Sequence, residues 1–161
     1  MVMSQGNKGI TLLELMVAVS ILGVLLSLGY VNFQTWVKRA RIKSAAYELA
    51  SIIHLARAKA LERGIWGIVS FNNNTITAFG DRNENGTHDE GEEIWFGKTY
   101  NPSIIIQKKG GSNPEPIKYR TSGLLHSGNQ TIEIKSSDGN YTYRVIISIT
   151  GRVRVDSHDI Q

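Results

Sequence analysis

The hydrophobic pattern of the first third of the chain changes once. From Ile10 to Phe33 the sequence is apolar on every side, and Glu14 is its only charged residue. Beyond Phe33, apolar residues recur every three or four positions, with Lys, Arg, Glu and Ser between them. No proline interrupts this stretch, and its basic last turn precedes Gly64. The pattern therefore predicts one helix from Ile10 to Arg63, apolar all round in its first half and amphipathic in its second.

One stripe of the amphipathic half is predicted to face a folded domain. Its members are Ile42, Ala45, Ala46, Leu49, Ile52, Ile53, Ala56, Ala60 and Leu61. After Gly64 the pattern is that of short β-strands separated by Gly, Pro, Asn and Ser clusters, at residues 65–71, 75–79, 94–96, 103–108, 117–120, 131–135 and 141–149. The predicted fold class is α+β, in which a long N-terminal helix (a transmembrane half plus an amphipathic half) packs on a small antiparallel β-sandwich.

The apolar half is long enough to cross a membrane. Its 24 residues would span a hydrocarbon core of about 30 Å as a helix. A carboxylate near the start of such a span is costly in lipid, so Glu14 indicates a function and a partner. The alternative interpretation is an ordinary single-span anchor whose Glu14 side chain reaches the membrane interface.

The residues around Gly9 resemble the N-terminus of type IV prepilins and type II secretion pseudopilins. The match consists of Lys8, Gly9, Thr11, Leu12, Glu14 and Leu15, with Ile10 where Phe or Met is commoner. In that family a peptidase removes a short basic leader after Gly, and the exposed residue is N-methylated. The long helix followed by strands resembles the GspH/FimT-type branch, in which no enzymatic activity is expected.

This resemblance implies a division into a leader (1–9), a transmembrane and assembly helix (10–33), the amphipathic half of the same helix (34–63) and a β-rich domain (64–161). A cut at Gly9 precedes the apolar segment, whereas an ordinary secretory signal is cut after it. The helix would thus stay in the mature protein. The new amino terminus at Ile10 and the carboxylate of Glu14 can pair within one helix or between stacked subunits, which lowers the cost of burying both.

Composition adds little to this picture. The chain has 161 residues and no cysteine, so disulfide and thiol chemistry are excluded. Four scattered histidines (His54, His88, His126 and His158) show no metal-ligand spacing, and no nucleophile–base arrangement is present, so we predict that the protein is not an enzyme. Basic residues after the apolar segment would favour a cytoplasmic domain. The resemblance instead implies a dedicated export route and a periplasmic domain.

An acidic stretch from Asp81 to Glu92 fits the calcium-loop pattern of oxygen-bearing side chains at alternate positions, Gly at the sixth and Glu at the twelfth. The predicted ligands are Asp81, Asn83, Asn85, the Thr87 carbonyl, Asp89 and Glu92. Strands rather than helices are predicted on both sides of it. The alternative interpretation is a solvated turn in which Asp and Asn side chains bond to their own backbone.

Residues 144–155 alternate between apolar and polar side chains, and Gly151-Arg152-Val153-Arg154 resembles a motif of DNA-uptake minor pilins. Arg152 and Arg154, supported by Lys108 and Lys109, are the candidate nucleic-acid contacts, because guanidinium groups bind successive phosphates. The alternative interpretation is a strand edge that charge protects from aggregation. A turn at residues 150–151 would weaken the common face.

The sequence thus predicts a minor pilin or pseudopilin in the inner membrane, which joins or primes a type IV pilus or a type II secretion pseudopilus. The implied partners are other pilin subunits, the prepilin peptidase that also methylates, the inner-membrane assembly platform and the lipid itself. No cofactor is expected apart from the calcium considered above. The alternative function is a DNA-binding minor pilin that acts in DNA uptake.

Overall fold

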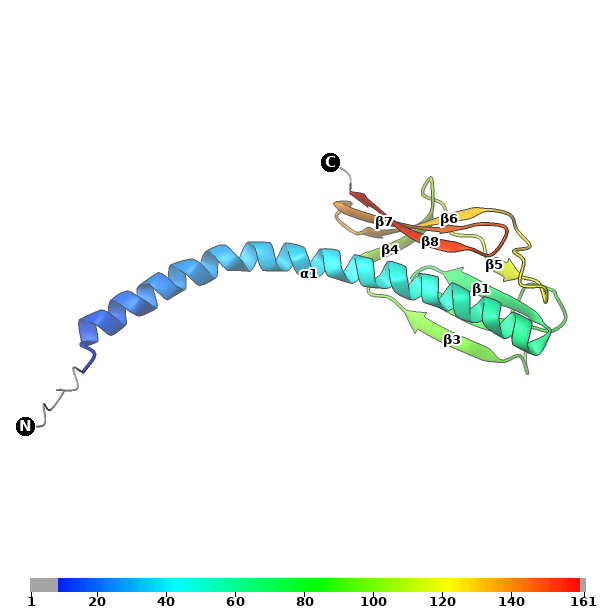
Figure 1. Cartoon of the computed structure of the whole chain (residues 1–161), viewed down its shortest axis with the longest axis horizontal. Helices are drawn as coiled ribbons and strands as arrows, with labels where there is room; N and C mark the ends of the chain where they lie inside the picture. Colours follow the sequence, from blue (N-terminus) through cyan, green and yellow to red (C-terminus); the bar gives the residue numbers. More distant parts are fainter. Residues whose placement is uncertain (1–8, 160–161) are drawn as a thin grey trace, which may run out of the picture. The chain divides into compact units, whose positions relative to one another are not determined.

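One long helix opens the structure, a computed structural model that describes residues 9–159, without the side chains of residues 27–32 and 158–159. Helix α1 runs from Leu12 to Arg63 (Figure 1). Thr11 caps its start, since the Thr11 Oγ1 accepts a hydrogen bond from the Glu14 N–H at 3.2 Å. Gly64 ends the helix in the left-handed conformation (φ 63°). The single uninterrupted helix predicted from the sequence is confirmed, and only its first two residues lie outside the observed helix.

In the part of the chain that the structure describes, eight strands follow and form two antiparallel sheets. One sheet has the order β3-β2-β1-β5 and the other β4-β6-β7-β8. The strand bounds are β1 Trp66–Asn72, β2 Thr75–Asp81, β3 Ile94–Thr99, β4 Ile104–Lys108, β5 Ile117–Tyr119, β6 Gln130–Ser136, β7 Tyr141–Ile147 and β8 Val153–Asp159. The predicted α+β class, with a helix packed on antiparallel sheets, is therefore confirmed.

The alternating segment 144–155 spans two strands, β7 and β8, and the turn considered at residues 150–151 lies between them. The Ser148 N–H donates to the Arg152 carbonyl oxygen at 2.9 Å, and Gly151 has a φ of 81°. Residues 148–152 therefore reverse the chain between β7 and β8. Val145 pairs with Val155 and Ile147 with Val153, so the alternating apolar residues still share one face after the turn.

The helix and both sheets share one hydrophobic core. The predicted helix stripe is buried at Ile42, Ala45, Ala46, Leu49, Ile52, Ile53, Ala56 and Ala60. Leu61, which was also predicted to lie in it, is half exposed and lies against Gly123. The Arg57 side chain lies alongside and donates to the carbonyl oxygens of Gly123 (2.9 Å) and Gly151 (3.3 Å). The helix thereby holds the loop after β5 and the β7–β8 turn.

The chain divides into two units, Met1–Lys38 and Arg39–Gln161, and the division falls inside α1. The domain boundaries expected from the sequence remain predictions. Over the residues searched, which are those that the structure describes, no helix combines the length and the apolar character needed to cross a membrane.

Candidate functional site

The described part of the first unit presents an exposed apolar helix surface. Every described side chain from Gly9 to Leu26 is exposed. Large apolar residues stand on all sides of the helix, and Ile10, Leu12 and Leu13 are each exposed by more than 70%. Soluble monomers rarely leave so large a continuous apolar surface in water, and such surfaces mark contacts with membranes or with other proteins.

Gly9, Ile10 and Glu14 all lie at the start of α1. Gly9 and Ile10 precede the helix, and Glu14 lies in its first turn. A negative charge at this position interacts favourably with the helix dipole. A side chain added at Gly9 would meet no atom of the described residues within 4 Å. Packing within the described part of the chain therefore does not require glycine at this position. Residues 1–8 of the predicted leader, Lys8 among them, lie outside the described residues.

The acidic loop between β2 and β3 is closed by hydrogen bonds to its own carboxylates. The Asp81 Oδ2 accepts from the Gly86 N–H at 2.7 Å. The Asp89 Oδ2 accepts from the Nδ2 atoms of Asn83 (2.8 Å) and Asn85 (2.6 Å), which lower the pKa of Asp89. Glu92 accepts from the backbone N–H groups of Arg82 (2.8 Å) and Asp89 (3.0 Å). The predicted ligand side chains are thus brought together in one loop.

Two features of this loop qualify the calcium prediction. The side-chain oxygens of Asn83 and Asn85 accept from the backbone N–H groups two residues later, as the alternative turn interpretation expects. Over the described residues, no group of three or more histidine, aspartate or glutamate side chains is placed to hold a metal ion by itself. A cation here would therefore need the amide and carbonyl oxygens as well.

No pattern in the sequence indicates that Lys118 lies beside this loop. Lys118 lies on β5, and its Nζ lies so close to Gly86 that a side chain at Gly86 would collide with it. β5 reaches the loop because it pairs with β1, which is distant in the sequence. Only the sheet order brings this ammonium group to the acidic loop.

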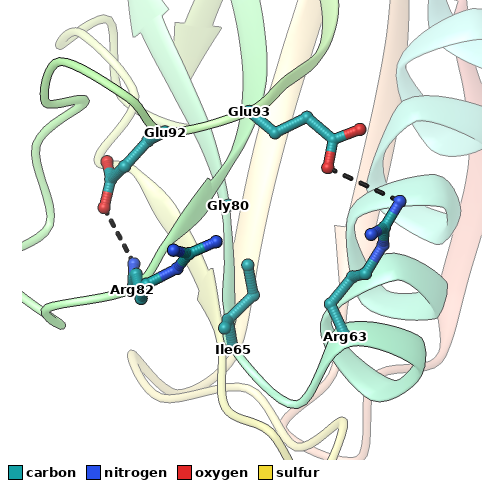
Figure 2. A pocket seen from close by; sticks show the side chains of 6 residues that line it. All are labelled: Arg63, Ile65, Gly80, Arg82, Glu92 and Glu93. Carbon is teal, nitrogen blue, oxygen red and sulfur yellow. Dashed lines mark hydrogen bonds and ion pairs between the residues drawn. The ribbon is translucent and has the colours of Figure 1, made fainter.

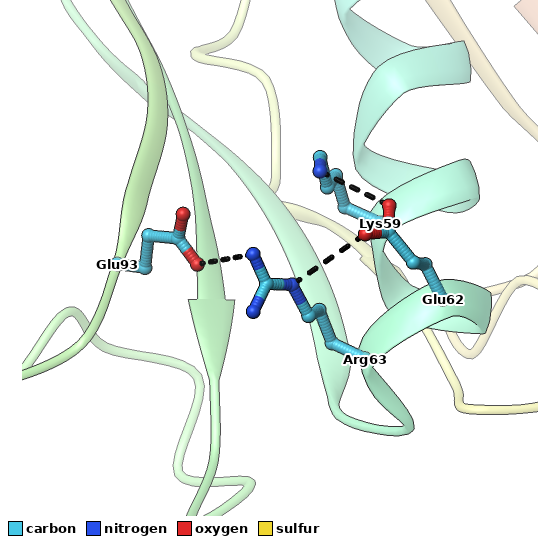
Figure 3. A network of polar contacts seen from close by, with 4 residues as sticks. All are labelled: Lys59, Glu62, Arg63 and Glu93. Carbon is cyan, nitrogen blue, oxygen red and sulfur yellow. Dashed lines mark hydrogen bonds and ion pairs between the residues drawn. The ribbon is translucent and has the colours of Figure 1, made fainter.

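A small pocket lies between the end of α1 and the acidic loop, lined by Arg63, Ile65, Gly80, Arg82, Glu92 and Glu93 (Figure 2). Arg63 forms an ion pair with Glu93 at 3.7 Å, and Glu62 lies between Arg63 and Lys59 at 3.8 and 3.0 Å (Figure 3). These partly exposed ion pairs connect α1 to the segment before β3. Such pairs contribute little stability individually.

The four basic residues predicted to contact nucleic acid are dispersed. Arg154 lies on β8 and forms an ion pair with Asp156 at 2.8 Å, while Arg152 is exposed beside the β7–β8 turn. Lys108 lies on β4, at the opposite edge of the same sheet, and pairs with Glu115 at 2.7 Å. The backbone register places Lys108 and Arg154 on opposite faces. The structure does not gather these residues into one basic patch.

The described histidines also lie apart. The His88 ring meets the Phe79 ring edge-on at 5.2 Å, and the His126 ring lies 4.9 Å from the Trp66 ring. His54 is exposed on α1, and the side chain of His158 lies outside the described residues. No two of the three described histidines are brought together in a constellation suited to acid–base or nucleophilic catalysis.

Comparisons with known proteins agree with this architecture. Residues 45–151 match the family described as "Type II transport protein GspH", and residues 4–30 match the "Prokaryotic N-terminal methylation motif". The chain is 30% identical to the pilin-like protein PilA1 of Thermus thermophilus over 157 residues, which cover 93% of this chain and 99% of PilA1. A probable minor fimbrial protein of Dichelobacter nodosus is 31% identical over 128 residues, which cover 78% of this chain and 74% of that protein.

Two solved structures have a similar fold. The minor pseudopilin EpsH from the type 2 secretion system of Vibrio cholerae superposes with a TM-score of 0.56 at 17% identity, over 71% of this chain and 95% of EpsH. The type IV minor pilin FimU of Pseudomonas aeruginosa gives a TM-score of 0.58 at 18% identity, over 75% of this chain and 92% of FimU. With its N-terminal methylation motif and its helix packed on two antiparallel sheets, the chain belongs to the GspH family of minor pilins and pseudopilins.

Proposed function

We propose that this chain is a fibre subunit that is processed after Gly9, held in the inner membrane by residues 10–33 and then assembled into, or at the start of, a type IV pilus or a type II secretion pseudopilus. The observation that carries the proposal is the exposed apolar surface of α1 from Ile10 to Leu26. In the membrane this surface would contact lipid. In a fibre it would contact the same helix of other subunits, so that helix–helix packing replaces lipid contacts.

Glu14 supplies the specificity of that assembly. Cleavage after Gly9 would place a positively charged amino terminus on Ile10, about one helical turn from the Glu14 carboxylate. Either charge alone would be costly to bury among apolar helices, whereas a pair costs less. We infer that Glu14 of one subunit neutralises the amino terminus of a neighbour when the apolar helices are stacked.

The β-rich domain would lie in the periplasm and then on the fibre surface or at its tip. Its partners would be other pilin or pseudopilin subunits, and the peptidase that removes the leader would also methylate Ile10. The family is structural and the described residues offer no catalytic constellation, so we propose no enzymatic activity. The dispersed positions of Arg152, Arg154, Lys108 and Lys109 do not favour the alternative of a DNA receptor.

The proposal is tested by fibre incorporation in cells that contain the assembly machinery. Glu14→Leu and Glu14→Gln should leave leader removal largely intact, because both residues fit a helix, but should reduce the subunit in the sheared fibre fraction roughly tenfold or more. Glu14→Gln keeps the shape of the side chain and removes its charge, so it separates electrostatics from packing.

Glu115→Gln is the matched control, because it removes an exposed carboxylate from the β-rich domain and should leave incorporation unchanged. Wild-type abundance of Glu14→Leu in the fibre fraction would show that charge pairing does not drive assembly.

A further inference from the structure

One buried carboxylate oxygen in the acidic loop has no hydrogen-bond partner among the described residues. Asp81 is 0% exposed, and its Oδ2 accepts from the Gly86 N–H, which directs the carboxylate into the loop. The Oδ1 of the same carboxylate is buried and has no hydrogen-bond partner among the described residues. A buried charged oxygen is costly unless it is paired or coordinates a metal. A ligand bound in the loop would account for the buried aspartate at this position.

The other oxygen-bearing side chains converge on the same small region. Asn83 and Asn85 both reach the Asp89 carboxylate, and the Glu92 carboxylate closes the loop from its far end onto Arg82. The side-chain oxygen of Asn83 accepts one backbone N–H and keeps a second lone pair, whereas that of Asn85 accepts both the backbone N–H and the hydroxyl of Thr87. A hard cation can use that lone pair of Asn83 directly, and the Asn85 oxygen once the Thr87 hydroxyl rotates away, while the loop keeps its backbone turns.

We propose that residues 81–92 bind one calcium ion, held by Asp81, Asn83, Asn85, the Thr87 carbonyl and Glu92, with Asp89 acting directly or through water. The sequence has the spacing that calcium loops require, and Gly86 adopts the positive φ (84°) of the sharp turn at the sixth position. An all-oxygen donor set of irregular geometry suits calcium better than magnesium, which demands a near-ideal octahedron. The flanking elements are strands β2 and β3 rather than helices.

Lys118 limits the affinity of this site. Its ammonium group lies against Gly86, and a positive charge near the loop repels a cation. Only three of the side chains are acidic, since two ligand positions carry asparagine. We therefore expect the weak end of the known range, with a Kd on the order of 0.1–1 mM, as in extracellular modules. Calcium would fill such a site outside the cytoplasm, a location that rests on the proposed function.

Calcium would fix the loop against the outer face of its sheet. Ile68 and Phe79 are buried there but lie outside the main core cluster, and His88 of the loop packs edge-on against Phe79. Holding the loop in place would keep this second, smaller apolar cluster covered. Binding to the folded state alone would raise the melting temperature.

The test uses the full chain in mild detergent, with radioactive calcium in equilibrium dialysis and thermal unfolding in CaCl₂ or MgCl₂. We expect one calcium per chain and a rise in melting temperature of roughly 3–6 °C at about 10 mM calcium, with a smaller rise in magnesium. Asp81→Asn and Glu92→Gln should each weaken calcium binding roughly tenfold or more, because each removes one ligand charge. Lys118→Met should tighten binding roughly threefold, because it removes the repelling charge.

Glu115→Gln and Lys109→Met are the matched controls, since each changes the same charge away from the loop and should leave binding unchanged. Lys118→Met keeps the test valid if Asp81→Asn fails to fold. The proposal is overturned if dialysis finds no calcium bound at about 10 mM, or if the loop variants bind as the wild type does. Neither result depends on leader processing or fibre assembly, so failure here leaves the proposed function standing.

Discussion

Tyr119 heads the fully buried side chains in volume, and its hydroxyl has no hydrogen-bond partner among the described residues. Burial raises the pKa of Tyr119 to about 12, although the nearby Arg57 charge acts in the opposite direction. The folded state thus favours the neutral phenol. Because the folded pKa lies above the unfolded value of about 10, the stability that this group contributes is complete below pH 10 and is lost as the pH rises towards 12.

Tyr119→Phe should therefore change the free energy of unfolding by less than about 1 kcal/mol at pH 7, since the lost hydroxyl makes no hydrogen bond. Above pH 10 the variant should lose less stability than the wild type, by an amount on the order of 2 kcal/mol at pH 12. Burial and Glu48 also raise the pKa of Tyr100, so some alkaline loss should remain. Denaturant unfolding at several pH values measures both effects, and equal pH dependence in the two proteins would contradict this account.

At the same scale, the sequence predicted which residues form the acidic loop but not their surroundings. Asp81, Asn83, Asn85 and Glu92 are identifiable because oxygen-bearing residues at fixed spacing fold back on one another locally. The approach of Lys118 depends on how β1 pairs with β5. Such long-range pairing leaves no local pattern in the chain.

At the scale of elements, the backbones of α1 and β1 come close together at Gly67. A Cβ at Gly67 would overlap the Ala56 carbonyl oxygen and lie 3.0 Å from the Ala60 Cβ. Two alanines on the helix and a glycine on the strand therefore let the backbones come together. The alanines were predicted as part of the buried stripe, but the need for glycine opposite them depends on which strand the helix crosses.

Gly67→Ala should destabilise the domain by about 1–3 kcal/mol, because the helix backbone cannot move aside without disturbing the core. Gly97→Ala on β3 is the control, since its Cβ would meet no atom within 4 Å. Thermal unfolding of the two variants should show a clearly lower melting temperature for Gly67→Ala only. A similar effect of both substitutions would mean that the close helix–sheet contact is not what makes glycine necessary.

The sequence predicted which segments are helix or strand, and it predicted their first and last residues less accurately. The helix and each predicted strand appear within a few residues of their expected positions, because hydrophobic periodicity and turn-forming residues are local features of the sequence. The sequence left the β7–β8 turn as one of two alternatives, because the two strands of the hairpin keep their apolar residues on one face and the alternation continues through the turn. Gly151 was the local sign of that turn. The division of eight strands into two sheets could not be read from the sequence.

At the scale of the whole molecule, the two units differ in what they bury. The buried core residues all lie from Ile42 onwards, so the second unit has its own core. The described side chains from Gly9 to Leu26 in the first unit are exposed instead. This division suits the proposed fibre subunit, since in that proposal the apolar helix leaves lipid and joins other helices without unfolding the domain.

The central claim, that the chain is a processed fibre subunit, is tested most directly by the intact mass of the protein produced together with a prepilin peptidase. The account predicts a mature chain that starts at Ile10 and carries one added methyl group. It also predicts that Gly9→Ala leaves the leader attached, while Gly23→Ala is processed normally, although the chain has room for a side chain at both positions. A mass equal to the full 161 residues, or a cut after the apolar segment, would contradict the account.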